Sequence, residues 1–190
     1  MALRDIDSHT RIERRTIAGK EARVYLDPDE IRVEWRPGRA VYLGVRVGDR
    51  IKNADRDVAS ARIDEWEVEE ITPERVVGRS IKTGERREWD RETLERGLVV
   101  GNYATNLTEF ATVVVHEIGR YDGRDPYVTV LAYGNNGEKY GRRYGFVDAG
   151  ERTVEFHDQD PAVERLAPEM ATAFDELVVG AMKDDGYVVR

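Results

Sequence analysis

The residues best suited to ligand chemistry form a basic and aromatic segment near residue 140, within an otherwise acidic half of the chain. Aromatic rings can stack on nucleic-acid bases, and Lys and Arg side chains can hold phosphate groups. On a strand, Tyr140, Arg142 and Tyr144 would share one face, because side chains alternate along a strand. The competing interpretation is an ordinary hairpin, in which tyrosines pack across strands and arginines pair with acids. The candidate binding residues for nucleic acid or another partner are Lys139, Tyr140, Arg142, Arg143 and Tyr144.

We expect these arginines to lie on a free surface. Replacing Arg142 and Arg143 together by Ala should then weaken nucleic-acid binding and flatten its salt dependence, while thermal stability stays nearly unchanged. A collapse of stability would instead mark the two arginines as structural.

A second basic and aromatic group lies in the first half of the chain. Arg86 and Arg87 are close to Trp89, and with Tyr42 and Trp66 they would line a groove for nucleic acid or a peptide. A small β-domain also needs large aromatic residues in its core, so core packing competes with binding as the role of the tryptophans. Arg86 and Arg87 are therefore the second set of candidate binding residues.

Two pairs of histidine and carboxylate residues carry the alternative of a metal-dependent enzyme. His116 precedes Glu117, and His157 precedes Asp158, with Asp160 close by. If the two strand ends lie side by side, they form a mixed nitrogen and oxygen site of a kind that binds zinc, manganese or iron. The competing interpretation is a half-buried strand residue and a polar loop. The sequence names no catalytic residue and no cofactor, and its candidate metal ligands are His116, His157, Asp158 and Asp160.

Composition excludes several classes of protein. The chain has 190 residues, of which 40% are hydrophobic and 36% charged, so it can bury a core and is not disordered throughout. It contains no cysteine, which rules out disulfides and thiol chemistry. No apolar run approaches the length of a membrane span and no signal-peptide core is present, so we expect a soluble, cytoplasmic protein without a membrane partner.

The charges are unevenly distributed. The net charge is -8, and the acidic excess falls mainly between Glu155 and Asp185, which argues against unspecific nucleic-acid binding over the whole surface. The cationic residues are 25 Arg and 5 Lys. An acidic, lysine-poor and cysteine-free chain resembles the proteins of halophilic archaea in composition, and this resemblance implies no activity.

The pattern of the first hundred residues predicts short strands separated by Gly, Pro and Asp turns. In the strand expected over residues 62–71, Trp66 and Val68 fall on one inward face. Asp90 is placed to cap a short helix over 91–96 that Gly97 would end. The spacing of the strands expected over residues 41–90 resembles that of an SH3-like or Tudor-like small antiparallel barrel, which implies a compact β-fold there.

The second half predicts a four-stranded meander followed by a helix. Residues 110–118 carry the most β-branched run in the chain and are expected to form a central strand. Strands follow over 127–133, 140–147 and 152–156, the first two joined by a Gly-Asn-Asn-Gly turn. A helical region over 161–182, broken or kinked at Pro168, carries an apolar stripe that should pack across the meander. The stripe comprises Leu166, Met170, Phe174, Leu177, Val178 and Ala181.

These patterns indicate a strand-dominated α+β fold: a small β-barrel-like region with an N-terminal hairpin over residues 1–100, and a meander packed by a C-terminal helix over 101–190. The two parts can also form one continuous domain. The sequence favours a non-catalytic binding protein that contacts nucleic acid or a protein through its β-surfaces. One alternative is a structural subunit of a larger complex or viral particle, which would self-associate; another is the metal-dependent enzyme.

Overall fold

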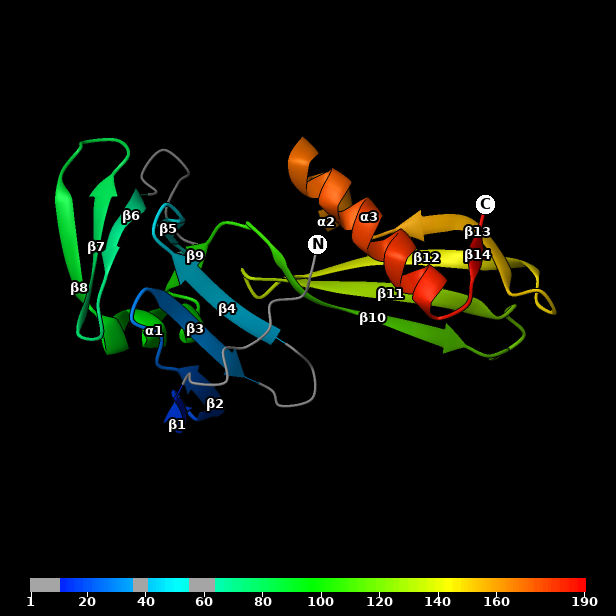
Figure 1. Ribbon diagram of the computed structural model, residues 1–190, viewed down its shortest axis with the longest axis horizontal. Helices are drawn as coiled ribbons and strands as arrows, with labels where there is room; N and C mark the ends of the chain where they lie inside the picture. Colours follow the sequence, from blue (N-terminus) through cyan, green and yellow to red (C-terminus); the bar gives the residue numbers. More distant parts are fainter. Residues whose placement is uncertain (1–10, 36–40, 55–63) are drawn as a thin grey trace. The chain divides into compact units, whose positions relative to one another are not determined.

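The computed structural model describes residues 11–35, 41–54 and 64–190, and within them it confirms a strand-dominated α+β fold (Figure 1). The described strands form three sheets, in which only the short β13–β14 pair is parallel. The described residues divide into two compact units. The N-terminal unit comprises 11–35, 41–54, 64–108 and 135–137, and the C-terminal unit comprises 109–134 and 138–190. The division of the chain into two separate domains near residue 100 stays a prediction.

The first sheet of the N-terminal unit has the strand order β1-β2-β3-β4. Its strands are β1 (Ile12–Ile17), β2 (Lys20–Tyr25), β3 (Glu30–Trp35) and β4 (Val41–Arg46). Ala18 and Gly19 join β1 to β2 with φ angles of 49° and 76°, the two positive values that a tight type I′ turn requires. Alternation sends Val24, Val33 and Val45 into the core, so the opposite face of this sheet carries the polar residues.

The second sheet of this unit has the order β8-β7-β6-β5-β9. As the alternation predicts, Trp66 and Val68 are buried, with 5% and 1% of their surfaces exposed. The strands of this sheet are β5 (Arg50–Asn53), β6 (Glu65–Ile71), β7 (Arg75–Ser80), β8 (Arg86–Asp90) and β9 (Tyr103–Thr105).

Helix α1 (Arg91–Val100) begins where the sequence predicts but ends later. The Asp90 carboxylate accepts a hydrogen bond from the Thr93 backbone N–H at 2.9 Å, so Asp90 is the N-cap. The predicted end at Gly97 is wrong: the helix continues, and Gly101 ends it with a left-handed φ of 86°. Gly97 is needed for another reason, since a Cβ there would lie 2.5 Å from the ring of Tyr103.

A buried arginine joins α1 to the loops of the N-terminal unit. Arg91 donates hydrogen bonds to the backbone carbonyls of Asp27 at 2.6 Å and Glu30 at 2.8 Å, and pairs with Glu95 one turn along the helix. Because these groups are buried, their hydrogen bonds must be made within the protein. Burial raises the pKa of Glu95, although Arg91 and Arg15 act in the opposite direction.

The sheet of the C-terminal unit has the order β10-β11-β12-β13-β14. Helix α3 packs on β10 and β11, and α2 packs on β12, with Phe174, Val178 and Met182 of α3 fully buried. The elements are β10 (Phe110–Ile118), β11 (Tyr127–Gly134), β12 (Lys139–Asp148), β13 (Thr153–Gln159), β14 (Val188–Val189), α2 (Pro161–Glu164) and α3 (Pro168–Asp184).

The meander of β10 to β13 and the interruption of the helix at Pro168 are as predicted. The predicted position of residues 110–118 is wrong, because β10 is an edge strand of its sheet and not a central one. Its β-branched residues gain burial from α3 instead of from a second neighbouring strand. Among the described residues, no helix combines the length and the apolarity that crossing a bilayer requires.

The turn between β11 and β12 belongs to the N-terminal unit. Asn135 has 1% of its surface exposed, and its side-chain amide donates hydrogen bonds to the carbonyls of Gly44 at 2.9 Å and Asn106 at 3.2 Å. The side-chain oxygen of Asn135 accepts a hydrogen bond from the Thr108 backbone N–H at 2.8 Å. The turn is therefore an anchored part of the fold, and its asparagine satisfies three backbone groups.

Candidate binding surfaces

The two tyrosines of the predicted stacking face are core residues. Tyr140 and Tyr144 have 4% and 2% of their surfaces exposed. The Tyr140 ring packs edge-to-face on Phe110, with 5.6 Å between ring centroids, and burial raises the pKa of Tyr144. Strand alternation does place both tyrosines with Arg142 on one face, but that face is the one covered by the helices. Neither ring is free to stack on a base.

Arg142 is held by the same covered face. Its guanidinium lies 2.7 Å from the carboxylate of Asp175 on α3 and donates to the Gln159 side chain at 2.9 Å. It also lies over the Phe174 ring, 4.9 Å from the centroid, and only 15% of the side chain is exposed. Arg142 therefore joins the sheet to α3, and the expectation of a free arginine surface does not hold at this position.

Lys139 and Arg143 lie on the opposite face of β12 and are exposed. The Arg143 guanidinium stacks over the Tyr127 ring at 4.8 Å and pairs with Asp158 at 3.2 Å. An open groove of about 780 Å³ adjoins this stack, with Arg124 and His157 in its lining. We call Arg124, Tyr127, Arg143 and His157 the hairpin groove. An anionic ligand in this groove would therefore compete with Asp158 for the edge of the stacked Arg143 guanidinium.

Arg86 and Arg87 are exposed, but both side chains have partners within the protein. Arg86 donates to the Glu69 carboxylate at 2.9 Å. The Arg87 guanidinium lies over the rings of Trp66 and Trp89, at 4.9 Å and 5.0 Å, and donates to the Tyr103 hydroxyl at 2.9 Å. The tryptophans are thus buried beneath a cation and present no open platform. The side chain of Tyr42, which the sequence adds to this group, lies outside the described part of the chain.

The expected meeting of the two His–carboxylate pairs does not occur. His116 is on β10 and His157 on β13, with β11 and β12 between them. Three strand spacings of about 4.8 Å put the two strands roughly 14 Å apart. Asp158 pairs with Arg143, and Asp160 lies at the start of α2. No group of three metal-ligating side chains occurs within residues 11–35, 41–54 and 64–190.

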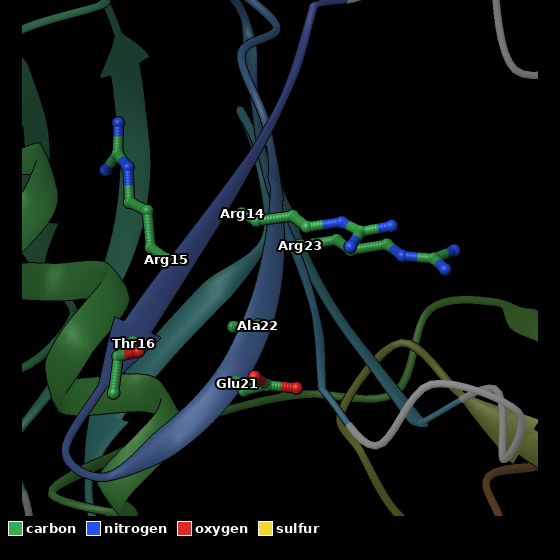
Figure 2. Close-up of a pocket in the computed structure, with 6 residues that line it drawn as sticks. All are labelled: Arg14, Arg15, Thr16, Glu21, Ala22 and Arg23. Atoms are coloured by element: carbon green, nitrogen blue, oxygen red, sulfur yellow. The ribbon is translucent and has the colours of Figure 1, made fainter.

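The first sheet carries a pair of arginines that sequence reasoning did not select. Arg14 on β1 lies directly opposite Arg23 on β2 in the antiparallel register. Figure 2 shows both side chains extending side by side in one direction, whereas the Arg15 side chain points to the other side of the ribbon. A shallow pocket of about 250 Å³ adjoins them and includes Thr16 and Glu21 in its lining. We call Arg14 and Arg23 the arginine doublet.

The arginine doublet has no counter-ion among the described residues. Arg15, on the other face, pairs with Glu13 at 2.8 Å and with Glu95 at 3.5 Å. Two acids lie near the doublet. Glu34, on β3, is directly opposite Arg23 in the register and accepts a hydrogen bond from the Tyr25 hydroxyl at 2.8 Å. Glu21 lies two residues before Arg23 and lines the same pocket. Like charges directly opposite each other destabilise a strand pair, so the doublet is a position at which an anion would be stabilising.

The signal for the doublet is the register of the β1–β2 hairpin. Ala18-Gly19 could have marked a two-residue turn, and the pairing of Arg14 with Arg23 follows from it. Comparisons of the chain with protein-family models, with curated proteins and with solved structures found no match.

Proposed function

We propose that the protein is a non-catalytic binding protein that holds nucleic acid through cationic side chains on its β-surfaces. The observation that carries the proposal is the arginine doublet. Two guanidinium groups side by side match the oxygens of a phosphate group, because each offers its N–H donors in a planar fork. Binding a phosphate there would also relieve the repulsion between the two arginines.

The hairpin groove is the second surface in the proposal. Its Tyr127 ring and Arg143 guanidinium both line the groove, and Arg124 and Lys139 add positive charge on the same unit, so a bound phosphate would compete with Asp158 for Arg143. Bases stack on such groups with little regard to sequence, at about 1–3 kcal/mol for each base. Of the sequence-predicted residues, Lys139, Arg143, Arg86 and Arg87 remain in the proposal, and the buried Tyr140, Tyr144 and Arg142 leave it.

The net charge of -8 shapes how such binding would behave. An acidic protein gains little from general attraction to a polyanion, so its binding depends on a few local phosphate contacts. We expect modest affinity, with a salt dependence that reports the number of those contacts. The resemblance of residues 41–90 to an SH3-like or Tudor-like barrel is consistent with a binding role, and it remains part of the proposal.

The test is fluorescence anisotropy with labelled single-stranded DNA and RNA oligonucleotides over a series of salt concentrations. The variant Arg14→Ala/Arg23→Ala should weaken binding and reduce the slope of log K against log salt by about 0.7, which corresponds to the one phosphate that the doublet holds on a single strand. Arg96→Ala/Arg165→Ala removes the same charge from two exposed positions outside both surfaces, and it should leave the slope unchanged. Equal effects of the two double variants would contradict the assignment of the doublet.

A second candidate function, a subunit of a larger assembly, rests on the edge position of β10. A nine-residue strand rich in β-branched residues at the edge of a sheet is a surface on which another chain can pair. Size-exclusion chromatography with light scattering, run at low and at molar salt, distinguishes the two candidate functions. A salt-insensitive oligomer favours the assembly, and a monomer that carries nucleic acid removable by molar salt favours the binding protein.

A further inference from the structure

Strand β10 leaves one side of its backbone without a partner strand in the described structure. It pairs with β11 along one side only and ends the order β10-β11-β12-β13-β14. Its outward backbone N–H and C=O groups therefore stand in a row along the edge. Such a row can hydrogen-bond to an added strand, and native edges of this length usually carry Lys, Pro or a bulge that prevents pairing. In β10 the register is irregular only near the start, between Phe110 and Thr112, and the central residues are Val113, Val114 and Val115.

A groove runs between this edge and helix α3. It has a volume of about 470 Å³, its floor includes Val113 and Val115, and its wall is formed by Ala173, Leu177, Gly180 and Ala181 of α3. These six residues are half-buried. A strand added beside β10 would extend the floor by about 4.8 Å, and every second side chain of that strand would point toward α3. The groove therefore suits an extended segment with small or β-branched apolar residues at alternate positions.

The charged side chains around the groove indicate which kind of segment it would bind. Its lining also includes Glu176, Asp184 and Asp185, and no basic side chain. All three acids are exposed. A second copy of this chain, paired edge to edge through β10, would bring the same acidic side chains to the shared interface, and like charges there oppose association. A segment flanked by Lys or Arg would instead meet opposite charge.

We propose that the β10 edge binds an extended basic segment of a partner protein, which adds as a further strand of the C-terminal sheet with its apolar residues in the groove beside α3. Backbone hydrogen bonds to β10 supply much of the affinity in this mode of recognition, and the pocket beneath alternate side chains supplies specificity. The inference goes beyond nucleic-acid binding and stands on different residues, so either can fail without the other.

The test uses a labelled peptide of alternating Val and Lys residues as the probe, with an alternating Val and Glu peptide as its counterpart. The full chain should bind the lysine peptide and not the glutamate peptide. Glu176→Lys/Asp184→Lys should weaken binding of the lysine peptide about tenfold or more, because two attractive contacts become repulsive. The control Glu151→Lys/Glu155→Lys makes the same change of charge at exposed positions outside the groove, and it should bind as the parent does.

Hydrogen exchange locates the bound strand. The peptide should slow the exchange of amides within residues 110–118 and leave the β1–β4 sheet unchanged. Equal binding by the groove variant and its control would overturn the proposal, and so would unchanged exchange in β10. Amides of the β10 edge that are already protected in the free protein, in a manner that depends on protein concentration, would show that a second copy occupies the edge instead.

Discussion

The guanidinium of Arg142 and the carboxylate of Asp175 lie 2.7 Å apart and connect strand β12 to helix α3. The neighbouring Arg143 points away from the helices and stacks on Tyr127. Two adjacent arginines therefore have different roles: Arg142 holds the helix on the sheet, and Arg143 faces solvent.

The first prediction separates these roles. Arg142→Ala should lower the free energy of unfolding by about 1–3 kcal/mol, because the largely buried Arg142 side chain would lose its charged hydrogen bonds to Gln159 and Asp175 and its packing on Phe174. Arg143→Ala should change it by less than about 0.5 kcal/mol, as is usual for an exposed position. Urea denaturation of the two single variants measures both values. Similar losses in the two variants would contradict this assignment.

The second prediction concerns the arginine doublet. Arg14→Glu places an opposite charge in front of Arg23 on the edge strand β1, so it should raise the free energy of unfolding by about 0.2–1 kcal/mol while it weakens oligonucleotide binding. Thermal and urea unfolding measure the first effect, and anisotropy measures the second. Arg165→Glu reverses an exposed charge that lies outside the doublet, and it should produce neither. A loss of stability in Arg14→Glu would mean that Arg14 and Arg23 do not repel each other.

A third prediction follows from the contact between α1 and β9. Alanine normally stabilises a helix relative to glycine by about 1 kcal/mol, yet Gly97→Ala should destabilise this protein. The new Cβ would lie 2.5 Å from the Tyr103 ring, whose hydroxyl bonds to both Arg87 and Trp89 and so resists displacement. Overpacking of this kind costs about 1–3 kcal/mol. Chemical denaturation decides the sign, and the tryptophan fluorescence should change as Tyr103 moves.

A fourth prediction uses pH. The Tyr187 hydroxyl donates to the Glu117 carboxylate at 2.6 Å, and burial together with this bond raises the pKa of Tyr187 to about 12. The pKa of Tyr187 in the folded protein exceeds its ordinary value of 10.0. The stabilisation that the protonated hydroxyl contributes is therefore complete below pH 10.0 and is lost as the pH rises through about 12. Tyr187→Phe should be less stable at neutral pH, and its difference from the parent should shrink over that range.

Unfolding by urea at several alkaline pH values gives that difference. All other ionisable groups are common to the two proteins, so their contribution cancels in this difference. A gap between the parent and Tyr187→Phe that stays constant from neutral pH to about pH 12 would contradict the raised pKa.

Strand positions and the inward face of β6 follow from local patterns, because alternation and turn residues act over short distances. Local patterns do not show which face of β12 is buried. The register pairs Tyr133 with Lys139, and Val130 with Arg142, which puts Tyr140, Arg142 and Tyr144 on the same side as the valines of β11. A register shift of one residue would reverse that face. The exposed or buried state of the hairpin tyrosines therefore depends on the pairing and could not be read from one strand.

The position of β10 shows a different limit. A run of valines indicates a strand, but it does not distinguish a strand with two neighbours from one with a neighbour and a helix, since both bury apolar side chains. The same holds for His116 and His157, whose separation depends on strand order. The arginine doublet required both the β1–β2 register and the absence of an ion pair to either arginine within the described part of the chain, and the second of these is a property of the folded surface.

The anchored turn at Asn135 constrains how the protein can fold as it is synthesised. Domains generally fold in order as they leave the ribosome. Here the N-terminal unit needs Asn135 to satisfy backbone groups at Gly44, Asn106 and Thr108. That residue emerges only after β10 and β11, which belong to the other unit. The N-terminal unit therefore cannot complete its hydrogen bonds until β10 and β11 of the C-terminal unit have been translated, which couples the maturation of the two units in time.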